Sequence, residues 1–267
     1  MNKKFDLTGK NILITGAAGL LGKQHAHAVA EMGGNPILID IEKTDEIKKS
    51  IIDKFGTDCQ NFIVDITKEN SLNELSNKLT NNSKSIDVLI NNAAIDSKVE
   101  NDQLKSNSLE NFTLDKWHNE IGVGLTGTFL CSKVFGKEMA KNKNGVIVNI
   151  ASDLALIAPD QRIYNNNGKE KNYKPITYSV IKHGIIGMTK YLSTYWLDKN
   201  IRVNALCPGG VTNNQDQEFI SKVTKLIPLG RLANVDEYHS AIQFLCSDAS
   251  SYMTGSCLVM DGGRSVW

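Results

Sequence analysis

Short, nearly continuous apolar runs recur along the chain and alternate with longer amphipathic segments. The runs are NILIT 11–15, PILID 36–40, FIVDI 62–66, DVLIN 87–91, VIVNI 146–150, IRVNAL 201–206 and CLVM 257–260. Because apolar and polar residues do not alternate within them, these runs suit strands that are covered on both faces. Helical spacing is found between them, in residues 20–32, 42–55, 68–80, 112–141, 177–198 and 234–247.

This alternation of strand and helix predicts an α/β fold. We expect a Rossmann-type, doubly wound sheet of seven mainly parallel strands with helices on both faces. No stretch has the composition of a linker, so residues 1–267 are predicted to form one domain. The polar segment 164–174, YNNNGKEKNYK, is predicted to be an exposed loop.

Composition excludes several classes of partner. Thirty basic and twenty-nine acidic residues give a net charge of +1, which does not favour nucleic acid or an anionic membrane as a partner. No apolar run reaches the length needed to cross a bilayer. The five cysteines are scattered, without the spacing of metal ligands, and are expected to be reduced thiols of a cytoplasmic protein that holds no metal.

A glycine-rich turn follows the first predicted strand. In TGAAGLLG, Gly16, Gly19 and Gly22 lie where that strand ends and a helix opens with Leu20 and Leu21. Glycine allows a tight turn and a close approach to a pyrophosphate, and the helix N-terminus supplies N–H groups. The alternative is a turn without a ligand. The strand before it and the helix after it favour dinucleotide binding.

An acidic residue ends the second predicted strand. Asp40 lies eighteen residues after Gly22. A carboxylate at this place accepts hydrogen bonds from the adenosine ribose hydroxyls and repels a 2′-phosphate. NAD is therefore favoured over NADP, although Lys43 nearby leaves NADP open, and a plain turn residue is the alternative for Asp40.

Tyr178 and Lys182 are spaced to share one face of a helix. A free phenol has a pKa of about 10 and is a poor base at neutral pH. A positive charge about 4 Å away is worth roughly 4 kcal/mol at an effective dielectric constant of about 20. That interaction brings the phenol pKa near neutrality, so the pair predicts a general base for an alcohol. Ser152 closes NIAS after the fifth strand, where its hydroxyl could orient a substrate oxygen or merely form a turn.

These motifs together resemble the short-chain dehydrogenase/reductase family, over nearly the whole chain from Leu7 to Trp267. The motifs are TGAAGLLG 15–22, VDI 64–66, NNAA 91–94, NIAS 149–152, YSVIK 178–182, PGGV 208–211, YMTG 252–255 and MDGG 260–263. The resemblance implies that Ser152, Tyr178 and Lys182 are catalytic. It also implies a cofactor site formed by Gly16, Gly19, Leu20, Leu21, Gly22, Asp40, Ile41, Asp65, Ile66, Asn91, Asn92, Ala93, Tyr178, Lys182, Pro208, Gly209, Val211 and Asn213.

Three positions depart from the family pattern. The middle glycine of the turn, Gly19, falls one place earlier than is usual in the family. Gly124 stands where the family generally has a catalytic asparagine, and glycine retains only the backbone carbonyl through which that residue supports a proton relay. Asn213 replaces a threonine that commonly contacts the nicotinamide carboxamide, and an amide can make a similar hydrogen bond.

The segment between Ser152 and Tyr178 is longer than in most of the family. Its twenty-five residues, 153–177, are expected to overhang the substrate side, where Asp160, Gln161 and Arg162 could hold sugar hydroxyls and a phosphate. A solvated hairpin without substrate contact is the alternative. A similarity to bacterial flagellin-modification oxidoreductases, which are associated with nonulosonic sugars such as legionaminic acid, is found in APDQRIY 158–164, KPITYSVIKHGIIGMTKYLSTYW 174–196 and the terminal DGGRSVW.

The expected protein is thus an NAD-dependent oxidoreductase that acts on a carbohydrate, in the form of a hexose phosphate or nucleotide sugar. A reductase of 3-oxoacyl thioesters or other small ketones and a non-catalytic, NAD-binding subunit remain alternatives. The resemblance also implies a homotetramer or dimer, with helices 112–141 and 177–198 as the interface.

Overall fold

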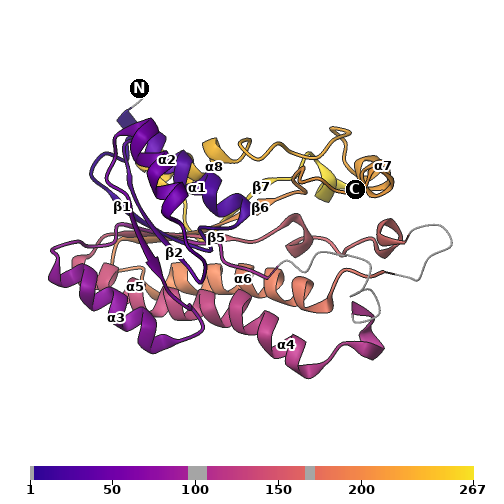
Figure 1. Ribbon diagram of the computed structural model, residues 1–267, viewed down its shortest axis with the longest axis horizontal. Helices are drawn as coiled ribbons and strands as arrows, with labels where there is room; N and C mark the ends of the chain where they lie inside the picture. The colour runs from indigo at the N-terminus through magenta and orange to yellow at the C-terminus, as the bar shows by residue number, and fades with distance from the viewer. Residues whose placement is uncertain (1–2, 96–106, 166–171) are drawn as a thin grey trace.

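Seven parallel strands form the central sheet of the protein (Figure 1). The computed structural model describes residues 3–95, 107–165 and 172–267. The strands lie in the order β3-β2-β1-β4-β5-β6-β7, and every pairing between neighbours is parallel. Their bounds are β1 (Asn11–Thr15), β2 (Asn35–Asp40), β3 (Gln60–Ile63), β4 (Val88–Asn91), β5 (Gly145–Ile150), β6 (Ile201–Pro208) and β7 (Cys257–Met260). The predicted doubly wound architecture is confirmed.

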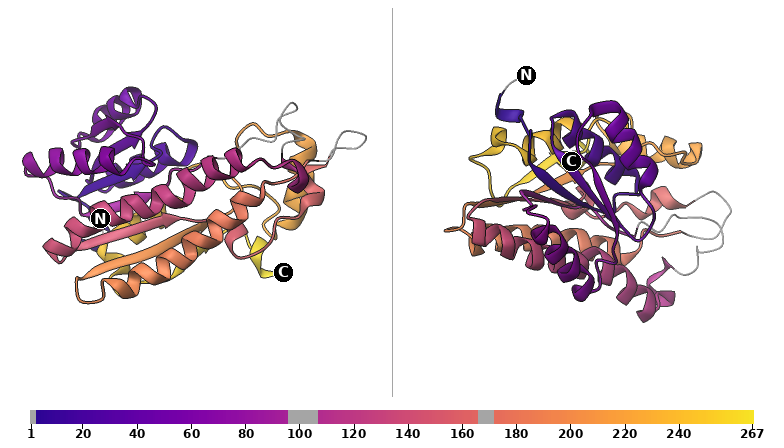
Figure 2. Two further views of the ribbon diagram at one scale, coloured as in Figure 1. Left: turned by 90° about the horizontal axis from the view of Figure 1, so that it is seen from below. Right: turned by 60° about the vertical axis from the view of Figure 1, so that its left-hand side comes forward.

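Helices cover both faces of this sheet, as Figures 1 and 2 show. One layer contains α1 (Leu20–Glu31), α2 (Asp45–Phe55) and α8 (His239–Cys246). The other contains α3 (Glu69–Asn81), α4 (Leu114–Ile121), α5 (Thr128–Asn142) and α6 (Ile176–Tyr195). The short helix α7 (Gln217–Val223) packs against the 3-10 turn Gln161–Tyr164.

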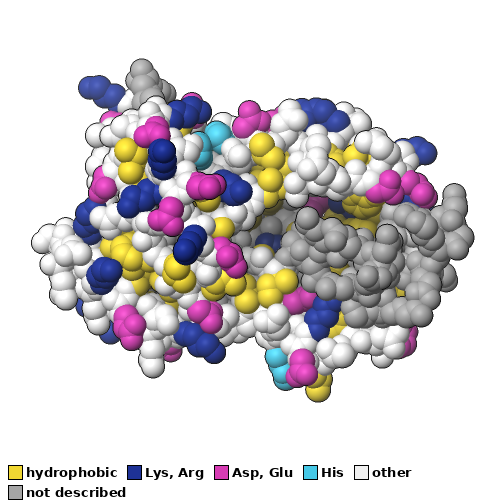
Figure 3. Space-filling view, viewed as in Figure 1, with side chains coloured by type: hydrophobic (Ala, Val, Ile, Leu, Met, Phe, Trp, Pro, Cys, Tyr) yellow, Lys and Arg dark blue, Asp and Glu magenta, His cyan; other side chains and the backbone are white. Residues whose placement is uncertain are grey.

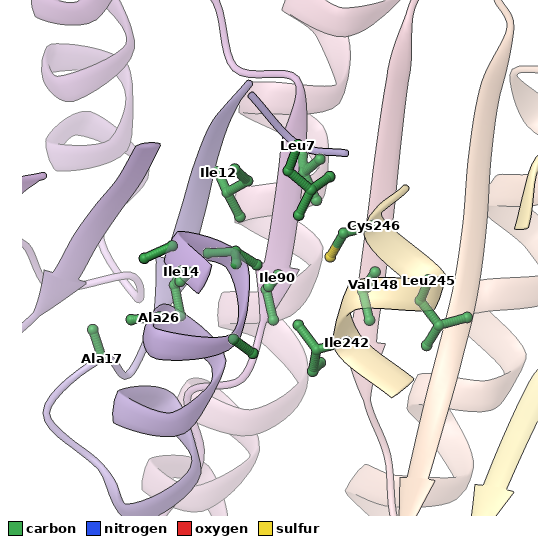
Figure 4. Packing of buried hydrophobic residues seen from close by; sticks show 14 of the residues in the cluster. Leu7, Ile12, Ile14, Ala17, Ala26, Ile90, Val148, Ile242, Leu245 and Cys246 are labelled. Atoms are coloured by element: carbon green, nitrogen blue, oxygen red, sulfur yellow. The ribbon is translucent and has the colours of Figure 1, made fainter. Parts of the chain in front are cut away.

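The apolar runs supply a core on each side of the sheet. In β1, Ile12 and Ile14 pack toward α1 and α8, whereas Leu13 between them packs toward α3 and α5. Successive side chains of a strand point to opposite faces, so a continuous apolar run fills both layers. Figure 4 shows the first cluster, in which Ala26 of α1 and Ile242 of α8 meet the sheet.

The structure corrects several predicted boundaries. The third strand occupies Gln60–Ile63 rather than 62–66, because its register sets Ile63 opposite Asp40, the last residue of β2. The predicted helix 234–247 begins only at His239. Glu237 accepts hydrogen bonds from Arg231 and from the Asn234 N–H, which hold the preceding residues in a turn. Helix α7 was not predicted, since only seven residues form it.

The predicted long helix 112–141 is divided by a π-helical segment. Residues Gly122–Gly127 form this segment between α4 and α5. A Cβ at Gly124 would lie 2.9 Å from Cγ2 of Ile181, so the missing side chain lets the segment approach α6. A side chain at position 124 would therefore require Ile181 to shift.

The surface charges and the cysteines are arranged as the composition led us to expect. On the face shown in Figure 3, basic and acidic side chains are interspersed. All five cysteines are free, and four are buried. Within the described ranges, the structure contains no helix long and apolar enough for a membrane span, and no cluster of three or more potential metal ligands.

Candidate active site

The carboxyl ends of the parallel strands bring most of the predicted site residues to one edge of the sheet. β1 is followed by Gly16, β2 ends at Asp40, β4 ends at Asn91, and Ser152 lies just past β5. In open α/β sheets, ligands bind outside this edge. A hollow of about 240 Å³ near Ser76, Lys84 and Phe135 lies by the start of β4 instead, at the opposite edge.

The glycine turn is fitted closely to the loop after β4. Gly16 has a φ of +64°, and a Cβ there would lie only 2.7 Å from Cα of Ala93. The Thr15 hydroxyl accepts hydrogen bonds from the N–H groups of Asn92 and Ala93, and the Asn92 amide donates to the carbonyls of Thr15 and Gly16. Asn92 therefore supports the turn, a role that sequence did not reveal.

The first turn of α1 is suited to a phosphate group. Its N-cap is Gly19, and no side chain caps it. A Cβ at Gly22 would lie 2.1 Å from the Gly16 carbonyl oxygen, so only glycine allows the helix to begin against the turn. Uncapped N–H groups and the helix dipole favour an anion here. The residues present fit the pyrophosphate of a dinucleotide.

Asp40 is fixed beside this turn. Its Oδ2 accepts a hydrogen bond from the Ala18 N–H at 2.9 Å, and its Oδ1 accepts one from the Glu42 N–H at 3.0 Å. Each carboxylate oxygen has a second lone pair that can accept from a ribose hydroxyl. Ile41 follows with 66% of its surface exposed, and Leu20 is exposed across the turn. Two apolar side chains and a carboxylate fit the adenosine end of a dinucleotide.

The remaining residues of the predicted cofactor site differ in exposure. Asp65 accepts hydrogen bonds from the hydroxyl and N–H of Thr67, and this hydroxyl lowers its pKa. Ile66 is buried, and a Cβ at Gly127 would lie 2.6 Å from its Cδ1, so its side chain packs into the core. Asn91 is also buried and donates to the side chains of Asn149 and Ser132. Ile66 and Asn91 can therefore offer a cofactor only their backbone.

The loop after β6 is tied at both ends. The Gly209 N–H donates to the Met260 carbonyl at 2.9 Å, and its own carbonyl accepts from the Tyr238 hydroxyl at 3.2 Å. Val211 forms a bridge with Ala233. The exposed Asn213 donates its N–H to Gln215. The loop of Pro208, Gly209 and Val211 is thus held beside the end of β5, because β5 and β6 are neighbours.

Tyr178 and Lys182 lie on the same face of α6. Nζ of Lys182 is 5.7 Å from the centre of the Tyr178 ring and donates to the Ile150 carbonyl at 2.8 Å. Lys182 is only 5% exposed, whereas Tyr178 is half-buried. A buried ammonium beside a more accessible phenol is suited to stabilise negative charge on the phenol oxygen.

Ser152 approaches the same helix from the sheet. It is 3% exposed, and the short helix Asp153–Ala155 that follows it packs on α6. Ala151 and Ala155 share a cluster with Ile181 and Ile185 of α6. A buried hydrogen bond from the Thr177 hydroxyl to Glu120 of α4 fixes the start of α6 from its other side.

A second ammonium group, missed at the sequence level, lies beside Tyr178. Nζ of Lys174 is 4.0 Å from the centre of the Tyr178 ring. Gln161 holds this lysine, since its Oε1 accepts a hydrogen bond from the Lys174 N–H at 2.9 Å. Lys174 precedes Pro175, the N-cap of α6, so helical spacing does not relate it to Tyr178, and the sequence held no signal for this contact.

The residues expected to hold substrate are engaged within the protein. Arg162 donates two hydrogen bonds to Asp160, at 2.8 and 2.6 Å, and these lower the Asp160 pKa to about 2. The Arg162 side chain is 88% exposed. Gln161 is bonded to the Lys174 backbone. Among the described residues of segment 153–177, Lys174 places a basic group against Tyr178.

Known proteins of one family match this chain over nearly its whole length. A family model described as enoyl-(acyl carrier protein) reductase matches residues 16–265. The 3-oxoacyl-(acyl-carrier-protein) reductase of Thermotoga maritima is 33% identical over 266 residues, which cover 97% of this chain and 99% of the relative. The D-threitol dehydrogenase of Mycolicibacterium smegmatis is 30% identical over 270 residues, which cover 98% and 95%.

Solved structures share the fold. A short chain dehydrogenase from Leptospira borgpetersenii with bound NAD+ matches with a TM-score of 0.86 and 30% identity, covering 99% of this chain and 96% of that one. A gluconate 5-dehydrogenase from Burkholderia cenocepacia in complex with NADP and tartrate matches with a TM-score of 0.85 and 26% identity, covering 99% and 98%. Because one holds NAD+ and the other NADP, the likeness leaves the choice between dinucleotides open.

Proposed function

Because the chain belongs to the short-chain dehydrogenase/reductase family, whose members are oxidoreductases acting on CH–OH groups, we propose that Ser152, Tyr178 and Lys182 catalyse hydride transfer on a carbohydrate. The observation that carries this proposal is the shared face of Tyr178 and Lys182 on α6, with Ser152 at the N-cap of the short helix that packs on α6.

Each of these side chains has a distinct task. The Tyr178 hydroxyl exchanges a proton with the substrate oxygen. Lys182 stabilises the negative charge that Tyr178 carries after losing its proton, and Ser152 orients the substrate oxygen by a hydrogen bond. A bound nicotinamide supplies the hydride acceptor or donor.

NAD(H) is the proposed dinucleotide rather than NADP(H). The support is Asp40, whose carboxylate is held at the end of β2 by two backbone N–H groups. A 2′-phosphate at this place would meet a negative charge, whereas ribose hydroxyls would find acceptors. The loop after β6, with Pro208, Gly209, Val211 and Asn213, is proposed to flank the nicotinamide.

The proposed substrate is an anionic hexose derivative, either phosphorylated or linked to a nucleotide. Lys174 supports this choice, because a phosphate or carboxylate of a substrate bound at the Tyr178 hydroxyl would lie near an ammonium group. Residues 158–164 and 174–196 and the terminal DGGRSVW also resemble bacterial flagellin modification protein A. We therefore propose that the reaction belongs to the synthesis of nonulosonic sugars such as legionaminic acid.

Reduction of a 3-oxoacyl thioester is the second candidate, favoured by the likeness to the Thermotoga maritima reductase. A spectrophotometric screen with NAD+ and NADP+ against hexoses, hexose phosphates and nucleotide hexoses tests the first candidate. The same screen with NADH and NADPH against 3-oxoacyl thioesters tests the second. NADH binding without turnover in either panel would contradict both and would favour a non-catalytic, NAD-binding subunit.

We further propose that two copies associate through α4, α5 and α6. Large apolar side chains are exposed on these helices: Leu114 72%, Phe129 49%, Tyr191 64% and Tyr195 61%. Their burial against a second copy is favourable. Light scattering is expected to find a dimer or tetramer, and a purely monomeric protein would contradict this assembly.

A further inference from the structure

The C-terminal segment places a buried arginine against the end of β5. Nη1 of Arg264 lies 3.1 Å from Oδ2 of Asp153, with the two side chains 7% and 3% exposed. Asp153 follows Ser152 directly in the chain. Such a pair far from water is costly to form and costly to break on one side only.

A tight turn directs this arginine inward. Oδ1 of Asp261 accepts a hydrogen bond from the Gly263 N–H at 2.9 Å, and its Oδ2 accepts one from the Ser265 N–H at 2.8 Å. Gly263 has a φ of +89°, which favours glycine, and a Cβ there would lie 2.8 Å from Cγ of Pro228. The DGGR sequence thus holds Arg264 in the orientation that reaches Asp153.

Asp153 is bonded to the serine proposed to be catalytic. Oγ of Ser152 donates to Oδ1 of Asp153 at 2.8 Å, and the same oxygen accepts from the Leu154 N–H at 2.8 Å. A carboxylate has only acceptors, so the hydroxyl hydrogen belongs to Ser152 and points to Asp153. One lone pair of the Ser152 oxygen accepts from the Leu154 N–H at 3.1 Å.

The hydrogen bond from Ser152 to Asp153 competes with the proposed hydrogen bond from Ser152 to a substrate oxygen. Ser152 can donate a hydrogen bond to a substrate oxygen only if its hydrogen turns away from Asp153. A carboxylate without a counterion would hold that hydrogen more strongly, because hydrogen bonds to a charged acceptor strengthen in a buried site. Arg264 pairs with Oδ2 of Asp153 and draws the negative charge of this carboxylate away from Oδ1, the oxygen that accepts from Ser152.

We propose that Asp153 and Arg264 are positioning residues, with Asp153 holding the Ser152 hydroxyl and Arg264 easing its release to the substrate oxygen. This inference rests on the proposed function of Ser152. It assigns to the C-terminal segment a part in the reaction, through a residue that directly follows the MDGG motif, residues 260–263.

A double-mutant cycle with Ser152 tests the inference. The variants are Arg264→Met, Ser152→Ala and the two combined, assayed for kcat and KM on the substrate found in the screen, with NADH binding measured in parallel. Arg264→Met is expected to lower kcat about tenfold in the wild-type background and less than twofold in the Ser152→Ala background. An equal loss in both backgrounds would overturn the inference, since a merely structural role does not depend on Ser152.

A second variant covers the case in which Arg264→Met fails to fold. Arg264→Lys keeps the positive charge. Its loss of kcat in the wild-type background is expected to be smaller than the tenfold loss in Arg264→Met, and its loss beside Ser152→Ala is again expected to be less than twofold. A loss of the same size in both backgrounds would again contradict the inference while leaving the function intact. If the wild-type protein turns over no alcohol or ketone, the proposed function fails, and this inference fails with it.

Discussion

Lys182 approaches the ring of Tyr178 to 5.7 Å while its ammonium donates to the carbonyl of Ile150, the last residue of β5. The lysine therefore connects the helix that carries the phenol to the strand that leads to Ser152. Since both its neighbours are parts of rigid elements, the three proposed catalytic side chains are positioned by the packing of α6 on β5.

Replacing Tyr178 with phenylalanine removes the hydroxyl and little else. We expect kcat to fall by about 10² to 10⁴, the contribution of one general acid–base group. NADH binding, measured by fluorescence titration, should change less than about twofold. Full activity in this variant would rule out Tyr178 as the proton-transferring residue.

Lys174→Met should weaken binding of anionic substrates selectively. A hydrogen bond between charged groups contributes about 1.5–3 kcal/mol, so KM for a hexose phosphate is expected to rise about tenfold or more. KM for the same hexose without its phosphate should stay the same. Lys190→Met, which removes an exposed lysine farther along α6, is the matched control. Equal effects on the two sugars would contradict an anion contact.

Asp40→Ser should shift the choice of dinucleotide. Removal of the carboxylate relieves repulsion of a 2′-phosphate and takes acceptors from the ribose. The ratio of kcat/KM for NAD+ to that for NADP+ is expected to fall about tenfold or more, equivalent to at least about 1.4 kcal/mol. Glu42→Gln removes a neighbouring negative charge and serves as the control. An unchanged ratio in Asp40→Ser would contradict the assignment of NAD.

His25 makes the stability of the protein sensitive to acid. It is fully buried in α1, and burial lowers its pKa to about 3, with a smaller contribution from His239. In the unfolded chain its pKa is about 6.5, so the unfolded state binds the extra proton below that pH. The contribution of His25 to stability is therefore full above about pH 6.5 and is lost as the pH falls toward 3.

Urea unfolding at pH 7 and pH 5 measures this effect. His25 should account for about 2 kcal/mol of the stability lost between these values. His25→Gln should lose correspondingly less between them, whatever its stability at pH 7. His183→Gln, an exposed histidine of α6, is the control and should behave as the wild type. The same pH dependence in His25→Gln and wild type would refute the assignment.

Gly124→Asn should destabilise the protein rather than improve catalysis. The new side chain would meet Ile181 at less than van der Waals distance, and overpacking of this kind costs about 1–3 kcal/mol. Urea unfolding should show this loss, and Ile181→Ala in the same chain should recover part of it. Stability equal to wild type in Gly124→Asn alone would contradict the close packing described here.

The parts of the fold that sequence predicted well are those set by local pattern. The buried strands β1, β2, β4, β5 and β6 follow from continuous apolar runs, and the turn at Gly16 follows from its glycines and its flanking elements. The predicted end of β3 was wrong because β3 ends where its partner β2 ends. Which residues of the two strands face each other is set by their pairing and cannot be read from the sequence of β3 alone.

The candidate site likewise contains residues that local sequence pattern predicts and residues that only the folded structure brings together. Tyr178 and Lys182 could be paired from their spacing along one helix. Arg264 could not be linked to Ser152, because the two lie more than a hundred residues apart and meet only through the turn after β7. The placement of Lys174 likewise depends on Gln161, whose hydrogen bond forms only once the segment has folded.

The contact between Gly124 and Ile181 also links the residue choices at these two positions. A Cβ at position 124 would lie 2.9 Å from Cγ2 of Ile181, so the isoleucine would have to shift to admit a side chain there. We expect the two positions to covary among relatives, with a larger residue at position 124 accompanied by a smaller one at position 181.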